Sequence, residues 1–221
     1  MDAFYGNNLS SVILKNLPLL EEIGADSFAE MSIKKLTLQN LPSLKIINAY
    51  AFYGNGMTDL VFDNVPNMEY FGYYSFSENA IPEFDFSIFP NLKTIDYHTM
   101  SHQGNATKKI TIDNPLLEYI GNFAFDYNYQ LKEVVMGENP SLKELALGAF
   151  KWDGLDNIVI PKNVQTIGDV CYYRDNTKIN SITTYGDDPT RFNSRWNNIG
   201  MNSASSVCPV MPADSNRVNC T

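Results

Sequence analysis

Apolar residues recur along this chain at an interval of about 24 positions. In the most regular column, a small residue precedes an aromatic residue or, in one unit, a methionine. The members of this column are Phe4, Phe28, Phe52, Phe76, Met100, Phe125, Phe150 and Tyr172. A repeated spacing of this kind predicts a stack of similar coils whose aromatic residues meet in one continuous core.

Apolar and polar residues also alternate between the aromatic positions. The apolar pairs are Val12 and Leu14, Leu36 and Leu38, Leu60 and Phe62, Phe84 and Phe86, Ile110 and Ile112, Val134 and Met136, Ile158 and Ile160, with Ile182 and Thr184 last. This period of two predicts short strands with one buried face. A Pro follows each of the first six pairs, and we expect it to end the strand because it lacks the N–H that a ladder needs.

An apolar column five residues before the aromatic position completes the unit. The next residue is often one that tolerates a positive φ, such as Gly24, Asn48 or Gly72, which predicts a tight turn there. No long stretch has a helical period, so we expect helix only as a single turn near the small-aromatic pair. Each unit then reads as a strand, a Pro corner, a short extended segment and two turns.

Four units carry an asparagine two residues after the second strand position. These residues are Asn16, Asn40, Asn64 and Asn114. An Asn side chain here can bond to the backbone of the next coil. We expect a ladder that satisfies backbone groups that would otherwise be buried without a partner.

The units resemble the BspA-type leucine-rich repeats, also called the Treponema pallidum type. The family's order of Leu, Ile, Ala-Phe and an alternating strand is matched by Leu44, Ile47, Ala51, Phe52, Met57, Leu60 and Phe62. It is matched again by Leu117, Ile120, Gly121, Ala124, Phe125, Leu131, Val134 and Met136. The resemblance covers about residues 3–185 and implies a repeat solenoid, a right-handed leucine-rich-repeat superhelix of the α/β class that is rich in β-structure. We expect about eight repeats of 22 to 25 residues.

The resemblance also carries expectations about function. It implies a secreted or cell-surface protein, mostly bacterial, and several members of the family are implicated in adhesion to host extracellular matrix or to other cells. No catalytic residues belong to the family's pattern, so none can be assigned to this chain.

The net charge of −9 narrows the classes of partner. No cluster of Lys and Arg is present to contact phosphates, which argues against nucleic acid and against an anionic membrane surface. No apolar run approaches the length of a membrane span. Three Cys at wide spacing predict neither a disulfide framework nor a zinc site.

The fifth unit departs most from the pattern. It has Met100 in the aromatic column, an insertion, and both histidines of the chain, His98 and His102. A spacing of four places two imidazoles on one face of a helix, and Asp96 is the nearby candidate for a third metal ligand. The alternative, which we favour, is a surface loop without a metal.

We divide the chain into a repeat array at residues 1–185 and a C-terminal cap at residues 186–221. The array starts in the middle of a unit, which predicts a fragment of a longer protein. Trp196 is expected to pack on the last core layer, with an exposed binding residue as the alternative.

The cysteines near this end have open alternatives. Cys208 and Cys220 form a disulfide within the cap or remain free thiols. Cys171 occupies the small-residue column, which predicts a buried thiol.

The residues between the inward strand positions are candidates for ligand binding on the concave face of the array. The charged candidates are Lys35, Asp59, Asp63, Glu83, Asp85, Lys109, Asp113 and Glu133. Four of them, on the third and fourth strands, predict an acidic patch that would suit a basic partner or a weakly held Ca²⁺. The alternative is a solvated face that keeps the sheet soluble.

The tyrosines near the turns are a second group of candidates. Tyr73, Tyr74, Tyr127 and Tyr129 fit either a binding surface or packing within the solenoid.

From the sequence we therefore expect a non-enzymatic protein-binding or adhesion module of a secreted or cell-surface bacterial protein. The partner would be a protein of the host extracellular matrix or of another cell surface. A structural spacer that presents a neighbouring domain is the alternative. We expect a monomer without cofactor, metal or catalytic residues, because no nucleophile motif, phosphate loop or Cys-His pair is present.

Overall fold

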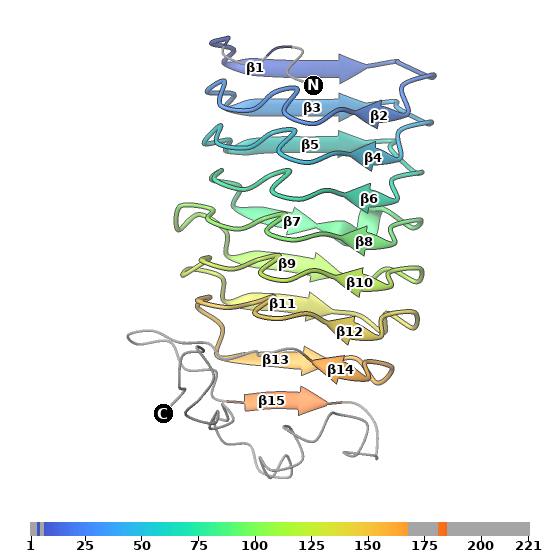
Figure 1. The fold of residues 1–221 in the computed structure, drawn as a ribbon, viewed down its shortest axis with the longest axis vertical. Helices are drawn as coiled ribbons and strands as arrows, with labels where there is room; N and C mark the ends of the chain where they lie inside the picture. Colours follow the sequence, from blue (N-terminus) through green and yellow to red (C-terminus); the bar gives the residue numbers. More distant parts are fainter. Residues whose placement is uncertain (1–3, 5–6, 168–180, 185–221) are drawn as a thin grey trace.

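The chain folds as a stack of flattened coils, as seen in the computed structural model (Figure 1). The structure describes residue 4, residues 7–167 and residues 181–184. Each coil carries a long strand on one side and a short strand on the other, and successive coils lie directly on one another. This is the solenoid that the repeat spacing predicts. The predicted cap at residues 186–221 lies outside the described residues, with Trp196, Cys171, Cys208 and Cys220.

The long strands form at the alternating segments. They are β1 (Ser11–Lys15), β3 (Lys35–Gln39), β5 (Asp59–Asp63), β7 (Glu83–Asp85), β9 (Lys109–Ile112), β11 (Glu133–Met136), β13 (Asn157–Ile160) and β15 (Ser181–Thr184). They pair in parallel, and the register joins equivalent positions, as Leu36 with Leu60. The strand prediction is confirmed, although the fourth unit forms only the three-residue β7.

The short strands form one continuous sheet on the opposite side. They are β2 (Glu22–Ile23), β4 (Ile46–Ile47), β6 (Tyr70–Phe71), β8 (Thr94–Ile95), β10 (Tyr119–Ile120), β12 (Glu144–Leu145) and β14 (Thr166–Ile167). Each pairs in parallel with the short strands of the coils before and after it. This sheet holds the coils at a constant spacing along the whole described stack.

The fourth unit does not form the long strand that its two phenylalanines predict. β7 ends at Asp85, and Phe86 opens a 3₁₀ turn, η1 (Phe86–Ile88). The Asp85 side chain caps this turn by accepting from the Ser87 N–H at 2.9 Å. The helical turn expected near the small-aromatic pairs is also absent, because these segments are turns in every described coil.

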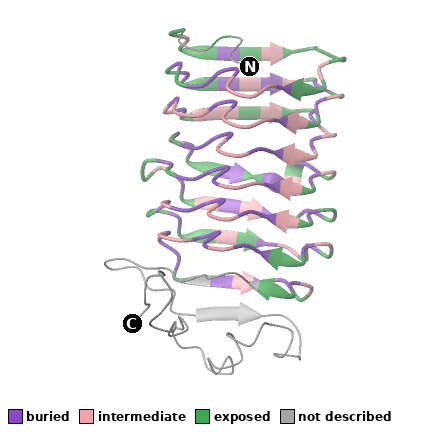
Figure 2. Cartoon of the chain, viewed as in Figure 1, coloured by how far each residue is buried: buried purple, intermediate pink, exposed green. Residues whose placement is uncertain are grey.

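The aromatic column forms the expected core. The rings of Phe28, Phe52 and Phe76 stack at centroid distances of 5.3 and 5.2 Å, and Phe125 stacks on Phe150 at 5.0 Å. Burying a phenylalanine stabilises the fold by about 1.5–3 kcal/mol, so the column contributes in every coil. Figure 2 shows buried positions running through each coil while exposed positions gather at the corners.

The glycine-type turn has a different cause from the one predicted. Gly72 and Gly121 do not have a positive φ. A Cβ on Gly72 would stand 2.8 Å from the carbonyl carbon of Asn48, and one on Gly121 would stand 2.7 Å from that of Asp96. Glycine is therefore required by close approach of the backbone of the preceding coil.

The predicted asparagine ladder exists, but it lies on the surface. Asn40 Nδ2 donates to Asn16 Oδ1 at 2.9 Å, and Asn64 Nδ2 donates to Asn40 Oδ1 at 3.0 Å, side chain to side chain. All three have a positive φ, so they end the strands before the prolines do. Asn114 is buried instead, and its side chain bonds to backbone carbonyls as expected.

A second polar column runs through the interior, three residues after Phe52 and after each later member of the aromatic column up to Phe150. It consists of Asn55, Asn79, Gln103, Asn128 and Asp153, all buried. Each side-chain amide donates to carbonyls of its own turn and of the coil before, while its oxygen accepts a backbone N–H of that coil. These bonds satisfy turn backbone that stacking alone leaves unpaired.

Asp153 occupies the last described position of this column with a carboxyl in place of an amide. Its Oδ1 accepts the Asn128 N–H at 2.9 Å, but its Oδ2 has no partner among the described residues. Burial raises the pKa of the Asp153 carboxyl well above its usual range, and the hydrogen bond from Asn128 opposes the shift. A neutral carboxyl can donate where an amide donates, so the fold favours the protonated form.

Replacing Asp153 by Asn should therefore stabilise the protein at neutral pH. An acid with a raised folded pKa contributes stability below its unfolded pKa of about 4 and loses it as pH rises through the folded pKa. We expect Asp153→Asn to increase the free energy of unfolding by about 1–3 kcal/mol at neutral pH and to change it little in acid. Thermal unfolding followed by circular dichroism across the pH range measures this.

Asn128→Asp is the matched control, because it moves the same carboxyl one coil earlier. It should destabilise the protein at neutral pH and recover part of that loss in acid. Equal stability of Asp153→Asn and the wild type at every pH would contradict a neutral Asp153.

Candidate functional site

The predicted ligand-binding residues lie together on the long-strand side. Seven of the eight are strand residues, and Asp113 directly follows β9. Lys35 Nζ lies 2.7 Å from Asp59 Oδ2, and Lys109 Nζ lies 2.8 Å from Glu133 Oε1. These ion pairs join neighbouring coils on an exposed surface, where such pairs contribute little stability.

The four predicted acidic residues lie on the third and fourth long strands, where the sequence assigns them. Asp59 and Asp63 lie on β5, while Glu83 and Asp85 lie on β7. Asp63 Oδ2 accepts from Gln39 Nε2 at 2.7 Å, on the side of β5 that faces β3. The acids are thus divided between two strands, and the space between those strands is the main irregularity of this face.

The long-strand sheet is interrupted between β5 and β7. β1, β3 and β5 form one sheet and β7, β9 and β11 another, and a second interruption separates β11 from the pair formed by β13 and β15. Figure 1 shows that the interval between β5 and β7 is visibly wider than the intervals between their neighbours. Before the break, Ala80 N–H donates to Met57 O at 2.8 Å. The next backbone bond between these two coils in the described chain comes only after the long strands, from Lys93 N–H to Glu69 O at 2.9 Å.

Pro82 is one cause of this break. At the equivalent position of other coils, a backbone N–H starts the ladder by donating to the coil before, as Lys34 does to Ser10, Thr58 to Lys34, and Lys132 to Lys108. Proline has no N–H, so the fourth coil cannot make this bond. The Pro82 carbonyl still accepts from Lys108 N–H at 2.8 Å, so pairing resumes on the following coil.

Phenylalanine packing is the second cause. The Phe62 ring lies edge-on to Phe89 at 5.0 Å and to Phe84 at 5.9 Å. Phe84 contacts Phe86 at 4.3 Å, and Phe86 lies at 5.4 Å from Phe71. These rings fill the space behind the break. On the opposite side β6 and β8 pair normally, so the two coils open only on the long-strand side.

A groove follows the break. The β5–β7 groove is an open depression of about 520 Å³ lined by Leu60, Val61, Phe62, Glu83, Phe84, Asp85, Ile88, Lys109 and Thr111. A smaller depression of about 200 Å³, lined by Asp63, Asn64, Val65, Pro66 and Phe89, shares Phe62 and Ile88 with it. The two together run along the strand direction from β5 to the Pro corner.

The inward residues of β5 are less covered than their equivalents. Leu36 and Leu38 on β3 have no exposed surface, whereas Leu60 and Phe62 on β5 are half-buried. The break therefore uncovers apolar side chains that the repeat pattern assigns to the core. Val61 and Ile88, which are 38% and 46% exposed, extend this apolar surface at the groove.

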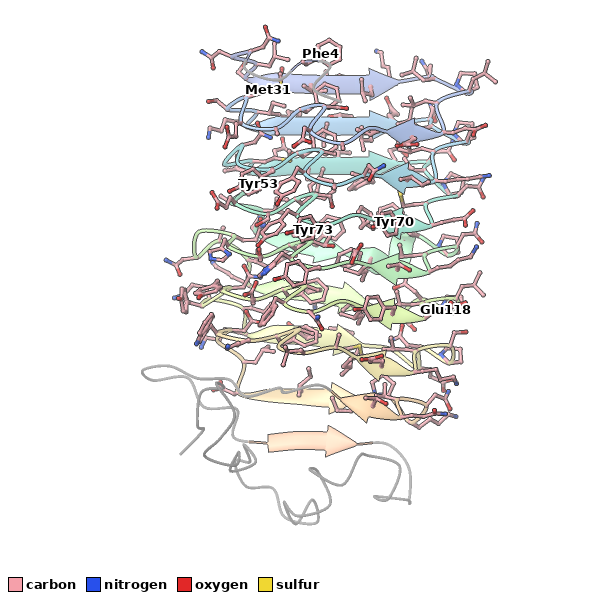
Figure 3. All side chains as sticks on the ribbon, viewed as in Figure 1. Phe4, Met31, Tyr53, Tyr70, Tyr73 and Glu118 are labelled. Atoms are coloured by element: carbon pink, nitrogen blue, oxygen red, sulfur yellow. The ribbon has the colours of Figure 1, made fainter. Side chains whose placement is uncertain are left out.

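A second surface lies at the turns, where aromatic rings stack from coil to coil. Tyr50 stacks on Tyr74 at 5.1 Å, Tyr74 on His98 at 4.5 Å, and His98 on Phe123 at 5.2 Å. Each of these four residues has a positive φ, which is unfavourable for a bulky side chain. Figure 3 shows tyrosines such as Tyr53 and Tyr73 on neighbouring coils of this region.

This stacking leaves ring edges rather than ring faces open to solvent. Tyr73 stacks on Tyr97 at 5.1 Å, and Tyr127 packs against Trp152 at 4.1 Å, while Tyr129 is 45% exposed. Burial raises the pKa of Tyr74 to about 12, so its hydroxyl remains a neutral donor. Since most ring faces are occupied, the β5–β7 groove is the better candidate for a binding site.

The structure corrects the expectation that both histidines lie on a surface loop. His98 is buried, and its Nδ1 lies 2.8 Å from Asp126 Oδ1. Burial raises the pKa of Asp126, although the hydrogen bond with His98 opposes this shift. His102 is exposed and stacks on Tyr127 at 4.1 Å. Asp96, the proposed third metal ligand, instead accepts hydrogen bonds from Tyr70 and Tyr97.

Two absences hold for the described residues only. There, no three His, Cys, Asp or Glu side chains come together in a way that could hold a metal ion. In the same part of the chain, no helix has the length and apolar character needed to cross a membrane.

Sequence comparison identifies the repeat. The model of the BspA type leucine rich repeat region matches residues 1–114 and 45–180 in six copies. The structure has eight long strands at the same spacing, so the number of copies matched by the family differs slightly from the number of repeats in the structure. No curated protein matches the sequence.

Solved structures resemble the chain in fold. A leucine rich cell surface protein from Faecalibacterium prausnitzii A2-165 matches with a TM-score of 0.64 and 20% identity, over 82% of this chain and 49% of that one. A leucine-rich repeat protein from Bacteroides ovatus has a TM-score of 0.45 and 15% identity over 81% and 61%. The pneumococcal vaccine antigen PcpA has a TM-score of 0.43 and 15% identity over 85% and 42%. The chain thus spans less than two thirds of each of these proteins.

The break should be visible in solution as fast amide exchange at one strand edge. We expect the amides of Leu60 and Phe62 to exchange at least about tenfold faster than those of Leu36 and Leu38, which face a paired strand. Hydrogen exchange followed by NMR measures each amide. Equal protection at these four positions would show that β5 and β7 pair in solution.

Proposed function

This chain belongs to the BspA-type leucine-rich repeat family, and from that premise we propose that it is a non-enzymatic protein-binding module of a secreted or cell-surface bacterial protein. The β5–β7 groove carries this proposal. It exposes apolar side chains beside charged residues on the long-strand side. The repeat pattern would otherwise bury these apolar side chains. Exposed apolar surface with a polar rim is typical of protein interaction sites.

Several features support a location outside the cell. The family resemblance points to secreted and surface proteins, and the similar Faecalibacterium structure is described as a leucine rich cell surface protein. The acidic surface disfavours binding to nucleic acid. We propose adhesion to a protein of the host extracellular matrix or of another cell surface, by a monomeric module.

The geometry of the charged groups favours binding over catalysis. Glu83 and Asp85 at the groove are exposed, whereas a catalytic acid or base needs a pocket that shifts its pKa and excludes water. His98 and Asp126 form a buried pair, but Tyr74 and Phe123 cover both faces of the imidazole ring. Neither group is placed to act on a substrate.

A structural spacer is the second candidate. The stacked phenylalanine core and the uninterrupted short-strand sheet give the array the rigidity that a spacer needs. The match also covers only 49% of the Faecalibacterium protein's chain, so that protein extends beyond the matched repeats. A spacer, however, has no use for an open groove.

A binding screen with a charge-reversal pair tests the proposal. The chain is screened against immobilised matrix proteins and glycans, and any interaction is measured again with Asp63→Lys/Glu83→Lys and with the control pair Glu118→Lys/Glu144→Lys. Both pairs change the net charge equally, but the control residues lie away from the long strands. We expect saturable binding to at least one protein, weakened at least about tenfold by the first pair only.

Two results would contradict the proposal. The absence of saturable binding to every protein tested would favour the spacer. Equal losses in both variant pairs would show that net charge, and not the long-strand face, determines binding.

A further inference from the structure

We propose that the β5–β7 groove binds an extended basic peptide, which lies between β5 and β7 as an added strand. The proposal rests on the proposed function as a protein-binding module and names the form of partner and the site it occupies.

The backbone edges on both sides of the groove are the first argument. In a parallel ladder, successive residues direct their N–H and C=O groups to opposite neighbours. Asp59 N–H donates to Lys34 O on the β3 side, so Leu60 and Phe62 direct their backbone groups towards the groove. Pro82 O accepts from Lys108 on the β9 side, which places the backbone groups of Glu83 on the groove side.

Among the described residues, no strand pairs with either edge. β5 pairs only with β3, and β7 pairs only with β9. Backbone donors and acceptors thus face each other across a depression, where an extended chain can bond to both. Addition of a strand to an open sheet edge is an established mode of peptide recognition, and here the peptide would have an edge on each side.

The side chains at the groove fit an alternating peptide. Leu60, Phe62 and Phe84 are the inward residues of the flanking strands, and they are apolar. A peptide strand directs every second side chain to the same face. Its inward residues would cover Leu60 and Phe62, which the break leaves half-buried. Its outward residues would lie beside the charged side chains that line the groove.

The charges at the groove select a basic partner. Glu83, Asp85 and Glu133 surround a single cation, Lys109, whose ammonium bonds to Glu133 at 2.8 Å. The three acids together raise the pKa of Lys109, with Glu133 acting most strongly, so the lysine stays charged. Because Glu133 on β11 pairs with Lys109, the two acids that line the groove, Glu83 and Asp85, leave it with a net charge of −2, and the outward positions of a peptide there would favour Lys or Arg.

The shape of the site favours a single segment over a folded partner. The opening lies between two coils that remain joined through β6 and β8 on the other side. Coil backbone therefore flanks the groove on both sides, whereas an exposed terminal edge would be open to the edge of another sheet. A disordered or terminal peptide segment can enter such a recess as an isolated strand.

Three end-blocked, fluorescently labelled heptapeptides test the inference on the whole chain. The first alternates Lys and Val, the second alternates Glu and Val, and the third is the Lys-Val peptide with the Val amides N-methylated. We expect the first to bind saturably in fluorescence anisotropy and the second to bind at least about tenfold more weakly. The third should not bind, because N-methylation removes the donors on one edge of the strand while keeping the charge.

Two measurements localise the binding. Glu83→Lys should weaken the Lys-Val peptide at least about tenfold, whereas Glu144→Lys, which makes the same charge change on β12, should not. In the wild-type chain, the peptide should slow hydrogen exchange at the Leu60 and Phe62 amides and leave Leu36 unchanged.

The inference is overturned if the Lys-Val peptide does not bind, if the N-methylated peptide binds equally well, or if Leu60 and Phe62 gain no protection. These results are separate from the protein-binding screen. Failure of the peptides together with binding of a matrix protein would remove only the added-strand mode. Failure of both would remove the proposed function as well.

Discussion

The fold depends on one requirement: each coil must satisfy its backbone N–H and C=O groups through its neighbours, because no coil is a closed structure by itself. The parallel ladders on both sides of the stack meet this requirement, with a register of one repeat. The phenylalanine column supplies apolar contact, but it does not set the spacing of the coils. Wherever a backbone donor is lost, the neighbouring coil loses a partner, and the stack must either repair the loss or open.

At the turns the loss is repaired by side chains. The buried amides of Asn55 and Asn79 bond to the carbonyls of two successive coils, which allows tight turns to stack without unpaired groups. Asp153 shows how specific this repair is. A carboxyl has the right shape but lacks a donor when ionised, so the site changes the pKa of the acid. At Pro82 no side chain replaces the missing donor, and the long-strand sheet opens.

Much of this fold follows from periodicity alone. The burial of Leu36, Phe52 and Ile47 can be predicted, because each residue belongs to an apolar column that recurs at the repeat spacing. The internal amide column follows from the same reasoning, since Asn55 and Asn79 recur at that spacing too. His98 occupies the column of Tyr74, which would have predicted its stacked and buried position.

The groove is harder to predict, because it arises from a combination of local and long-range causes. Pro82 occupies the position of Thr58, whose N–H makes the first ladder bond of the previous coil, and this is a signal in the sequence. The 3₁₀ turn at Phe86 is different, because the alternating pattern of the unit predicts a strand there. It forms where rings from two coils compete for one space, and the spacing of residues along the chain does not encode that competition. The predicted acidic residues therefore lie on the long strands, but on opposite sides of an opening that the pattern does not contain.

The energetics of an added strand explain why both backbone and side chains matter at such an opening. A net backbone hydrogen bond contributes about 0.5–1.5 kcal/mol, while ordering one peptide residue costs about 1–2 kcal/mol. The ladder by itself therefore roughly balances the loss of conformational entropy and supplies register more than affinity. Binding must be driven by the burial of Leu60 and Phe62 and by charge pairing at Glu83. A coil whose long strand is paired on both sides lacks the first of these terms, because its inward residues are already covered, so an external strand gains this burial only at a break such as the one between β5 and β7.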